Sequence, residues 1–231
     1  MKKIFLIIAT VILLFSCGQT KNEDELIDMF IGNGENNTPR IRPENYGDMQ
    51  PTQNVYLQNF DNAATSEWVE KNDGYSMQGY ENGELVIQGK QNYHTWQNFS
   101  NLNQSLDFQM EIRAQFNFVA VTSVDAYLGI VYGVDSNKNS FYYIALFNND
   151  KMQIGYCNGS AYDNWYIQPS NLTKNAHHVY TIRKAGNQMY FFADKNFVYK
   201  TTYSQFLPNY GFWLSTGGIV SADYARIDYI E

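Results

Sequence analysis

Residues 127–156 read YLGIVYGVDSNKNSFYYIALFNNDKMQIGY, and this stretch decides the fold. It contains three short segments rich in β-branched and aromatic residues, at 127–134, 140–147 and 151–156. Polar turn formers separate them, because 135–139 and 148–150 consist mostly of Asp, Asn, Ser and Lys. The pattern predicts three antiparallel strands joined by two hairpins.

A register for these hairpins follows from the alternation of side chains. If Val134 faces Ser140 and Phe147 faces Lys151, one face of the sheet becomes a continuous apolar layer. That layer contains Leu128, Ile130, Tyr132, Tyr142, Ile144, Leu146, Met152 and Ile154. We therefore expect this face to pack in the core.

The opposite face mixes aromatic rings with residues that have almost no side chain. Its members are Tyr127, Gly129, Val131, Gly133, Phe141, Tyr143, Ala145, Phe147, Lys151, Gln153 and Gly155. A solvated face normally carries Lys, Glu and Thr. The pattern predicts a shallow trough with aromatic patches. The alternative is that the glycines mark bulges and that the aromatics pack under a loop.

Further short strands complete an all-β domain over residues 55–231. The clearest is 108–118, where even-numbered apolar residues alternate with polar residues such as Glu111 and Arg113. If this strand pairs with the one that begins at Tyr127, Glu111 and Arg113 line the trough. The number of strands and turns predicts a two-sheet antiparallel β-sandwich of the jelly-roll type. Residues 158–171 are expected to form a loop that carries Trp165.

The N-terminus has the parts of a secretory signal. Residues 1–16 place Lys2 and Lys3 before an apolar run that is too short to span a membrane comfortably. LFSC, ending at Cys17, resembles a bacterial lipobox, in which the cysteine is lipidated and becomes the mature N-terminus. The resemblance implies an outer-membrane lipoprotein of the cell envelope, surface-exposed, with residues 17–54 as a flexible linker. The alternative is a signal peptide with a coincidental cysteine.

Composition limits the partners. The chain has 231 residues and a formal charge of −7, from 16 basic and 23 acidic residues. An acidic protein is not suited to bind a polyanion, so nucleic acid is excluded as a partner. With Cys17 in a processing signal, Cys157 is a single thiol and no intramolecular disulfide is expected.

The order of the short motifs resembles the concanavalin A-like lectin/glucanase superfamily, in particular the laminin G-like domains of bacterial surface proteins. The matching pieces include YENGELVI at 80–87, DFQME at 107–111, GIVYG at 129–133 and ARIDYI at 225–230. The resemblance covers residues 55–231. It implies a β-sandwich that often binds carbohydrate, sometimes with calcium, and it also admits glycoside hydrolases and 3-keto-glycoside hydrolases.

The residues argue against the hydrolase alternative. Laminarinase-type members of that superfamily carry Glu-x-Asp-x-x-Glu, which is missing here. Asp107 and Glu111 share a strand face, but four residues at about 3.3 Å each separate them by about 13 Å. Glycosidase carboxylates lie roughly 5 to 9.5 Å apart. A catalytic Glu111 would need an acid from another strand, so we expect no catalytic residue.

Carbohydrate binding fits the trough better. Sugar rings stack on aromatic faces, while their hydroxyls bond to planar donors and acceptors. The predicted binding residues are Glu111, Arg113, Tyr127, Tyr143 and Gln153, with Trp96 or Trp165 as a stacking surface. Trp68 and Trp213 are assigned to the core. A protein-binding adaptor of the envelope remains the other alternative.

No metal site is expected. Asp61 with Asp223 or Asp228 would offer carboxylates for calcium where the terminal strands meet, but no dedicated calcium loop is present. His177 and His178 point to opposite faces of a strand and cannot converge on zinc. The predicted cofactor is none, with calcium as the alternative.

Overall fold

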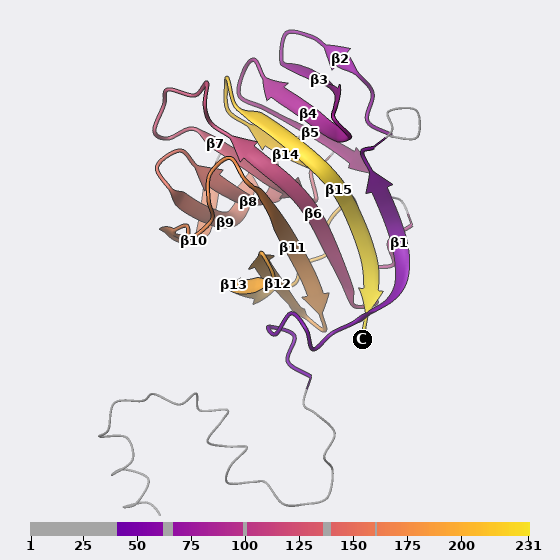
Figure 1. Cartoon of the computed structure of the whole chain (residues 1–231). Helices are drawn as coiled ribbons and strands as arrows, with labels where there is room; N and C mark the ends of the chain where they lie inside the picture. The colour runs from indigo at the N-terminus through magenta and orange to yellow at the C-terminus, as the bar shows by residue number, and fades with distance from the viewer. Residues whose placement is uncertain (1–40, 62–66, 99–100, 136–139, 160) are drawn as a thin grey trace, which may run out of the picture. The chain divides into compact units, whose positions relative to one another are not determined.

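The computed structural model describes residues 41–61, 67–98, 101–135, 140–159 and 161–231, and within these ranges all regular structure is β-strand. Fifteen strands form two antiparallel sheets (Figure 1). We call the nine-stranded sheet A and the six-stranded sheet B. The predicted lipidated Cys17 and signal peptide lie outside the described residues, and no helix in the described part is long and apolar enough to cross a membrane.

Sheet A has the order β13-β12-β11-β6-β15-β4-β3-β2, and β1 pairs with the second half of β15. Its strands are β1 (Pro51–Asn59), β2 (Lys71–Asn72), β3 (Ser76–Glu81), β4 (Glu84–Gly89), β6 (Phe108–Asn117), β11 (His177–Ala185), β12 (Gln188–Ala193), β13 (Asn196–Thr202) and β15 (Ile219–Ile230). The long C-terminal strand β15 therefore lies at the centre of this sheet.

Sheet B has the order β10-β9-β8-β7-β14-β5. Its strands are β5 (Tyr93–Asn98), β7 (Tyr127–Tyr132), β8 (Ser140–Phe147), β9 (Lys151–Asn158), β10 (Tyr162–Pro169) and β14 (Asn209–Leu214). The chain crosses between the sheets before β5, β6, β7, β11, β14 and β15, which is the jelly-roll pattern of a sandwich.

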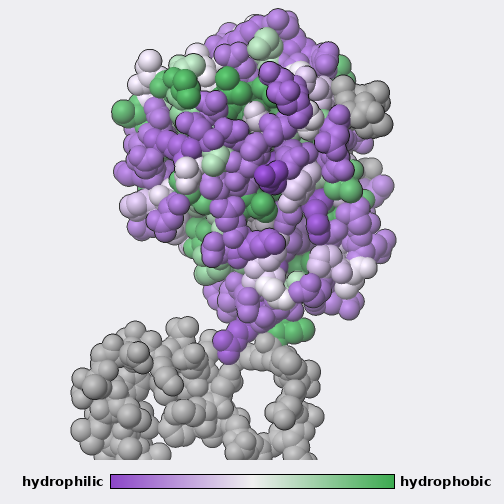
Figure 2. Space-filling model, in the orientation of Figure 1, coloured by the Kyte–Doolittle hydropathy of each residue, from purple (hydrophilic) through white to green (hydrophobic). Residues whose placement is uncertain are grey.

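The core lies between the two sheets. Alternate residues of β6, such as Met110 and Ile112, meet Ile130 and Ile144 from sheet B, and all four side chains are at most 2% exposed. Trp68 joins this core as predicted, at 1% exposed. Outside the core, hydrophobic side chains are scattered among hydrophilic ones on the face seen in Figure 2.

The predicted register of residues 127–156 is confirmed. Tyr127 pairs with Phe147, and Leu146 pairs with Met152, which is the alignment that places Val134 opposite Ser140 and Phe147 opposite Lys151. The predicted apolar layer from Leu128 to Ile154 belongs to the core cluster. The other residues of these strands form the outer face of sheet B, which points away from sheet A.

Three expectations about neighbouring segments are wrong. Strand β6 does not pair with β7, because it lies in sheet A between β11 and β15. Residues 158–171 are not a loop, since β10 pairs along β9. The fold also begins before Val55, because β1 starts at Pro51 and residues 41–50 form turns against sheet A, where Arg183 donates to the carbonyls of Pro43 and Tyr46.

Candidate functional site

A pocket opens on the outer face of sheet B where two small residues lie side by side. Trp213 of β14 pairs with Gly129 of β7, Gly129 pairs with Ala145 of β8, and Ala145 pairs with Gln153 of β9. This row places a large ring at one end, an amide at the other, and almost no side chain between them. The alternation of the three predicted strands therefore produces a hollow.

Rings and polar side chains surround this hollow, which has a volume of about 250 Å³. We call it the aromatic pocket. Its rings belong to Tyr127, Tyr143, Phe147, Tyr162 and Trp213. Its polar side chains are Asp125, Gln153 and Asn164.

Trp213 holds the aromatic walls together. Its ring centre lies 3.9 Å from that of Tyr127, 5.2 Å from that of Tyr143 and 5.5 Å from that of Tyr162, with Tyr162 stacked at 16°. Trp213 is 6% exposed, whereas Tyr162 is 52% exposed. Tyr162 therefore presents a ring to solvent on a rigid aromatic base.

The pocket's phenols are protonated at neutral pH, and burial raises their pKa values further. Desolvation raises the pKa of Tyr127 to about 12, and it also raises the pKa values of Tyr143 and Tyr162. At neutral pH these side chains are uncharged hydrogen-bonding groups. The aromatic wall therefore adds no charge to the pocket.

A hydrogen bond across β9 fixes the wall of the pocket that Tyr143 and Asn164 form. The Tyr143 hydroxyl donates to Asn164 of β10, passing over Gly155 of the intervening strand. A Cβ on Gly155 would lie 2.6 Å from that hydroxyl oxygen, so the tyrosine can cross only because this residue is glycine. The glycine thus has a packing reason, and the bulge considered from the sequence is not needed to explain it.

The polar side chains of Gln153 and Asp125, which also line the pocket, remain available to a ligand. Gln153 is partly exposed and its side-chain amide makes no hydrogen bond to the part of the chain that the structure describes, and Asp125 is exposed. An amide both donates and accepts, and a carboxylate accepts. The pocket thus combines stacking surfaces with groups that bind hydroxyls.

The structure brings together three of the predicted binding residues, Tyr127, Tyr143 and Gln153. Trp96 of β5 packs beside the same buried cluster on the outer face of sheet B, without lining the pocket. Trp165 lies on the other side of β10. Its ring packs against the core and is 5.8 Å from Tyr142, so it is not the loop-borne platform that we expected.

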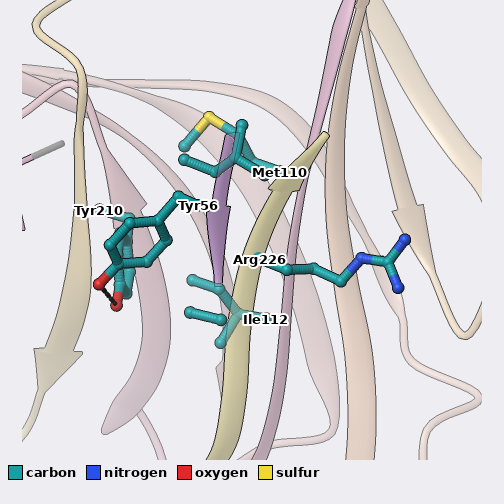
Figure 3. Close-up of a pocket in the computed structure, with 7 residues that line it drawn as sticks. Tyr56, Met110, Ile112, Tyr210 and Arg226 are labelled. Carbon is teal, nitrogen blue, oxygen red and sulfur yellow. Dashed lines mark hydrogen bonds between the residues drawn. The ribbon is translucent and has the colours of Figure 1, made fainter. Parts of the chain in front are cut away.

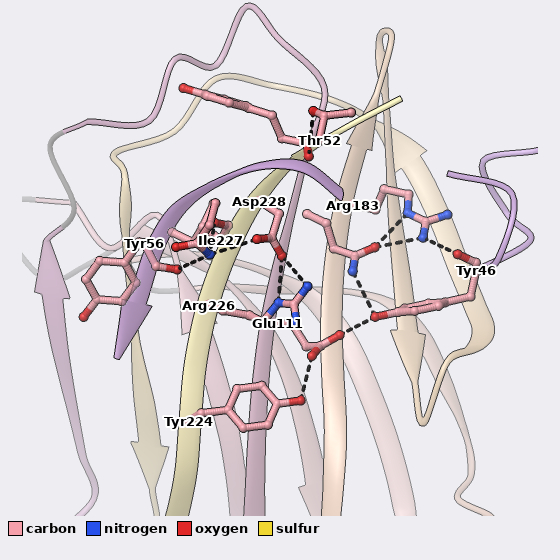
Figure 4. Close-up of polar contacts among 12 residues, drawn as sticks. Tyr46, Thr52, Tyr56, Glu111, Arg183, Tyr224, Arg226, Ile227 and Asp228 are labelled. Atoms are coloured by element: carbon pink, nitrogen blue, oxygen red, sulfur yellow. Dashed lines mark hydrogen bonds and ion pairs between the residues drawn. The ribbon is translucent and has the colours of Figure 1, made fainter. Parts of the chain in front are cut away.

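Glu111 and Arg113 lie on the outer face of sheet A, so their predicted place in the trough is wrong. The error follows from the β6–β7 pairing that the structure does not have. Glu111 is 6% exposed and accepts hydrogen bonds from the hydroxyls of Tyr46 and, at 2.6 Å, Tyr224 (Figure 4). Arg113 forms an ion pair with Asp223. These side chains are already occupied by protein partners.

The polar network on sheet A includes the carboxylates considered for calcium. Asp228 binds Arg226 at 2.6 Å and accepts from Asn54 at 2.8 Å, while Asp223 binds Arg113. Within the described ranges, no group of three or more His, Cys, Asp or Glu side chains is arranged to hold a metal ion. Asp223 and Asp228 are thus each paired with an arginine side chain.

A gap beneath β15 is closed to ligands. It lies among Tyr56, Met110, Ile112, Tyr210 and Arg226, and it has no room for a water-sized molecule. Figure 3 shows the Arg226 guanidinium pointing away from the two tyrosines, whose hydroxyls lie 3.2 Å apart. This gap is part of the core packing.

Sequence reasoning missed several pocket residues. Trp213 was assigned to the core, but it packs on the outer face of sheet B. The alternation in β14 contained the signal, because Tyr210, Phe212 and Leu214 all face the core and Trp213 must face the other way. Tyr162 and Asn164 are absent from the predicted binding residues because the sequence of 158–171 predicts a loop, whereas the structure has strand β10 there.

Comparisons with known proteins identify the fold. The sequence matches no protein-family model, and no curated protein matches it. Among solved structures, one from a study of the endo-acting O-glycanases that human gut bacteria express to initiate mucin breakdown is similar, with a TM-score of 0.57 and 12% identity over 77% of this chain and 100% of the other.

Two further structures have a similar fold. The catalytic domain of an endo-1,3-β-glucanase (laminarinase) from Thermotoga petrophila has a TM-score of 0.53 and 12% identity, covering 78% of this chain and 97% of the other. The CBM2 module of the evolved Dit of Lactobacillus casei phage J-1 has a TM-score of 0.51 and 15% identity, over 78% and 97%. At these identities the likeness concerns the fold alone.

Proposed function

From a β-sandwich of the concanavalin A-like fold and the aromatic pocket on its sheet B, we propose that this protein binds carbohydrate. One observation carries the proposal: five aromatic rings and three side chains able to bind hydroxyls surround a single open pocket of about 250 Å³. The volume is somewhat below the roughly 300 to 1,000 Å³ of pockets for drug-sized ligands, and it suits a sugar ring.

The pocket matches the two kinds of surface on a sugar. The half-exposed ring of Tyr162 offers a flat face for the C–H side of a pyranose, and its stacking on Trp213 holds it in place. Gln153 and Asp125 lie on the same pocket and can bind hydroxyls. A ligand without hydroxyls would leave these polar groups unused, which favours a sugar over a purely apolar molecule.

We propose that the protein binds glycans without cleaving them. Asp125 is the one carboxylate among the described residues that line the aromatic pocket. Glycoside hydrolysis ordinarily needs a pair of carboxylates, roughly 5 to 9.5 Å apart. Glu111, considered earlier as a catalytic acid, lies on sheet A and bonds to two tyrosines. In this proposal the structurally similar endo-1,3-β-glucanase shares the fold of this protein and not its chemistry.

The proposal extends to the place where binding occurs. The lipobox-like sequence ending at Cys17 supports a lipid-anchored protein of the bacterial envelope, with the sandwich displayed at the outer membrane surface. Incorporation of labelled fatty acid into the wild-type protein, and its loss in Cys17→Ala, tests the anchor. Digestion of intact cells by added protease tests surface display.

A glycan array followed by calorimetry tests the binding proposal. We expect wild-type protein to bind at least one glycan, and Tyr162→Ala to weaken binding by about fivefold or more, since loss of a stacking ring costs about 1 kcal/mol or more. Gln153→Ala should also weaken glycan binding. The matched control is Tyr75→Ala, because Tyr75 is 56% exposed and lies beside sheet A. Equal affinity of Tyr162→Ala and wild type would refute this site.

A further inference from the structure

A second cavity adjoins the aromatic pocket. It is formed by residues within 120–127, the turn at 215–217 and Asn92, and has a volume of about 410 Å³. We call it the loop cleft. Asp125 and Tyr127 line both cavities, so the two compartments meet at these side chains. The loop cleft alone lies within the roughly 300 to 1,000 Å³ that small-molecule sites span, the aromatic pocket alone lies below it, and the two together lie well inside it.

The loop cleft differs in chemistry from the aromatic pocket. Tyr127 is its one aromatic residue among those described, and hydroxyl and amide side chains from Thr122, Ser123, Ser215 and Asn92 replace the rings. Such a surface binds hydroxyls without offering a stacking platform. A ligand that fills both cavities therefore needs one unit held by stacking and another held by hydrogen bonds.

Hydrogen bonds hold the walls of the loop cleft in place. The Asn148 amide donates to the Ser123 carbonyl at 3.0 Å, and the Gly217 amide donates to the Gly89 carbonyl at 2.7 Å. Asn92 accepts from the Thr216 amide at 3.2 Å, and Ser215 accepts from the Tyr127 amide at 2.9 Å. A wall fixed in this way loses little conformational entropy when it binds a ligand.

The described residues that line the two cavities carry a single charge, and it is negative. Asp125 is the single charged side chain among their described lining residues, and it stands at the boundary. Among the described residues that line the two cavities, none is a lysine, arginine or histidine that could pair with a carboxylate or sulfate. A uronate bound here would meet a like charge and find no counter-ion.

We infer that the site takes an uncharged linear oligosaccharide of at least two residues, one in the aromatic pocket and the next in the loop cleft, with the chain crossing beside Asp125. The inference rests on the proposed carbohydrate function and adds length and charge selectivity to it. Asp125 accepts hydrogen bonds from hydroxyls near the linkage, and its charge weakens the binding of acidic sugars.

Calorimetry with defined sugars tests the length. The probes are β-1,3-gluco-, β-1,4-gluco- and β-1,4-xylo-oligosaccharides of one to four residues. We expect affinity to rise at least about tenfold from the monosaccharide to the trisaccharide in the series that binds, as one further set of hydrogen bonds implies. Thr122→Trp, which fills the loop cleft, should lower trisaccharide affinity to that of the monosaccharide. The control is Thr202→Trp, because Thr202 is exposed at the end of β13 in sheet A.

Trigalacturonate tests the charge. Wild-type protein should bind it at least about fivefold more weakly than the neutral trisaccharide, and Asp125→Asn should narrow that difference, since it removes the repelling charge. Trisaccharide affinity that equals monosaccharide affinity, or that Thr122→Trp leaves unchanged, overturns the two-compartment site but leaves the proposed function standing. Failure of the wild type to bind any saccharide overturns the proposed function itself.

Discussion

At the scale of single residues, the hydroxyl of Tyr46 shows how a polar sheet face is stabilised. It donates to Glu111 and accepts from the Gln109 amide at 2.9 Å, on a face where Glu111 is 6% exposed. Glu111 takes its second hydrogen bond from Tyr224. A buried carboxylate needs such partners, because an unpaired one would pay its full desolvation cost.

Tyr46→Phe should therefore destabilise the domain. The substitution keeps the ring over Arg183, whose guanidinium carbon lies 5.0 Å from the ring centre, and removes only the hydroxyl. We expect the free energy of unfolding to fall by about 1 to 3 kcal/mol, measured by urea denaturation. Tyr75→Phe, at an exposed tyrosine, should change it by less than about 0.5 kcal/mol. Equal stability of the two variants would show that this hydroxyl contributes nothing.

The residue scale also shows what the sequence predicts and what it does not. Alternation placed Tyr127, Tyr143 and Gln153 on one face, and the structure confirms that they share a pocket. The same alternation placed Glu111 and Arg113 together on one face of β6, which is correct, but it cannot say which sheet the strand joins. Period-two patterning specifies faces, whereas the crossing between sheets depends on long-range packing.

At the scale of elements, β10 is the least predictable strand. Most of its residues are exposed because it is an edge strand of sheet B, so its sequence lacks the apolar alternation that marks β6. A bulge between Asn164 and Tyr166 also breaks its period. Asn164 therefore lines the aromatic pocket, while Trp165 and Tyr166 both pack against the core. No simple periodicity in the sequence describes that arrangement.

Gly155→Ala should disturb the contact between β9 and β10. The added Cβ would lie 2.6 Å from the Tyr143 hydroxyl oxygen and nearer still to the Asp163 carbonyl oxygen, which is closer than van der Waals contact allows. We expect a loss of about 1 to 3 kcal/mol in the free energy of unfolding, typical of overpacking, together with weaker glycan binding because Tyr143 and Asn164 form a pocket wall. Hydrogen exchange of β10 should accelerate.

The matched control for this variant is Gly79→Ala. Gly79 also lies within a strand, β3, but a Cβ there would meet no atom within 4 Å. The substitution should leave stability unchanged or raise it by up to about 1 kcal/mol, because alanine restricts the unfolded chain. If both variants lost the same stability, the loss would come from a general effect of alanine on the strand backbone. It would not come from the contact between residue 155 and the Tyr143 side chain that crosses β9.

At the scale of the whole molecule, tyrosine connects the core, the pocket and the sheet A network. The chain has 19 tyrosines. Burial raises the pKa values of Tyr56, Tyr127 and Tyr203 each to about 12, and it also raises those of Tyr180 and Tyr210 in the core. The sequence predicts an aromatic-rich sandwich, but only the folded structure shows which of these hydroxyls are buried away from solvent.

These pKa shifts predict that the protein loses stability at alkaline pH. The ordinary pKa of tyrosine is about 10, so below that pH the phenols are protonated in both the folded and the unfolded chain. Between about pH 10 and 12 the unfolded chain releases protons that the folded chain retains, and the free energy of unfolding falls as pH rises. Urea denaturation at a series of pH values should show a plateau at neutral pH and a decline above about 10.

Tyr56→Phe should make this decline shallower, because phenylalanine does not titrate. The change in slope should be less than about 1.4 kcal/mol per pH unit, because Tyr56 is partly solvated. An unchanged slope in Tyr56→Phe, or constant stability up to pH 12, would contradict the raised pKa of this partly buried hydroxyl.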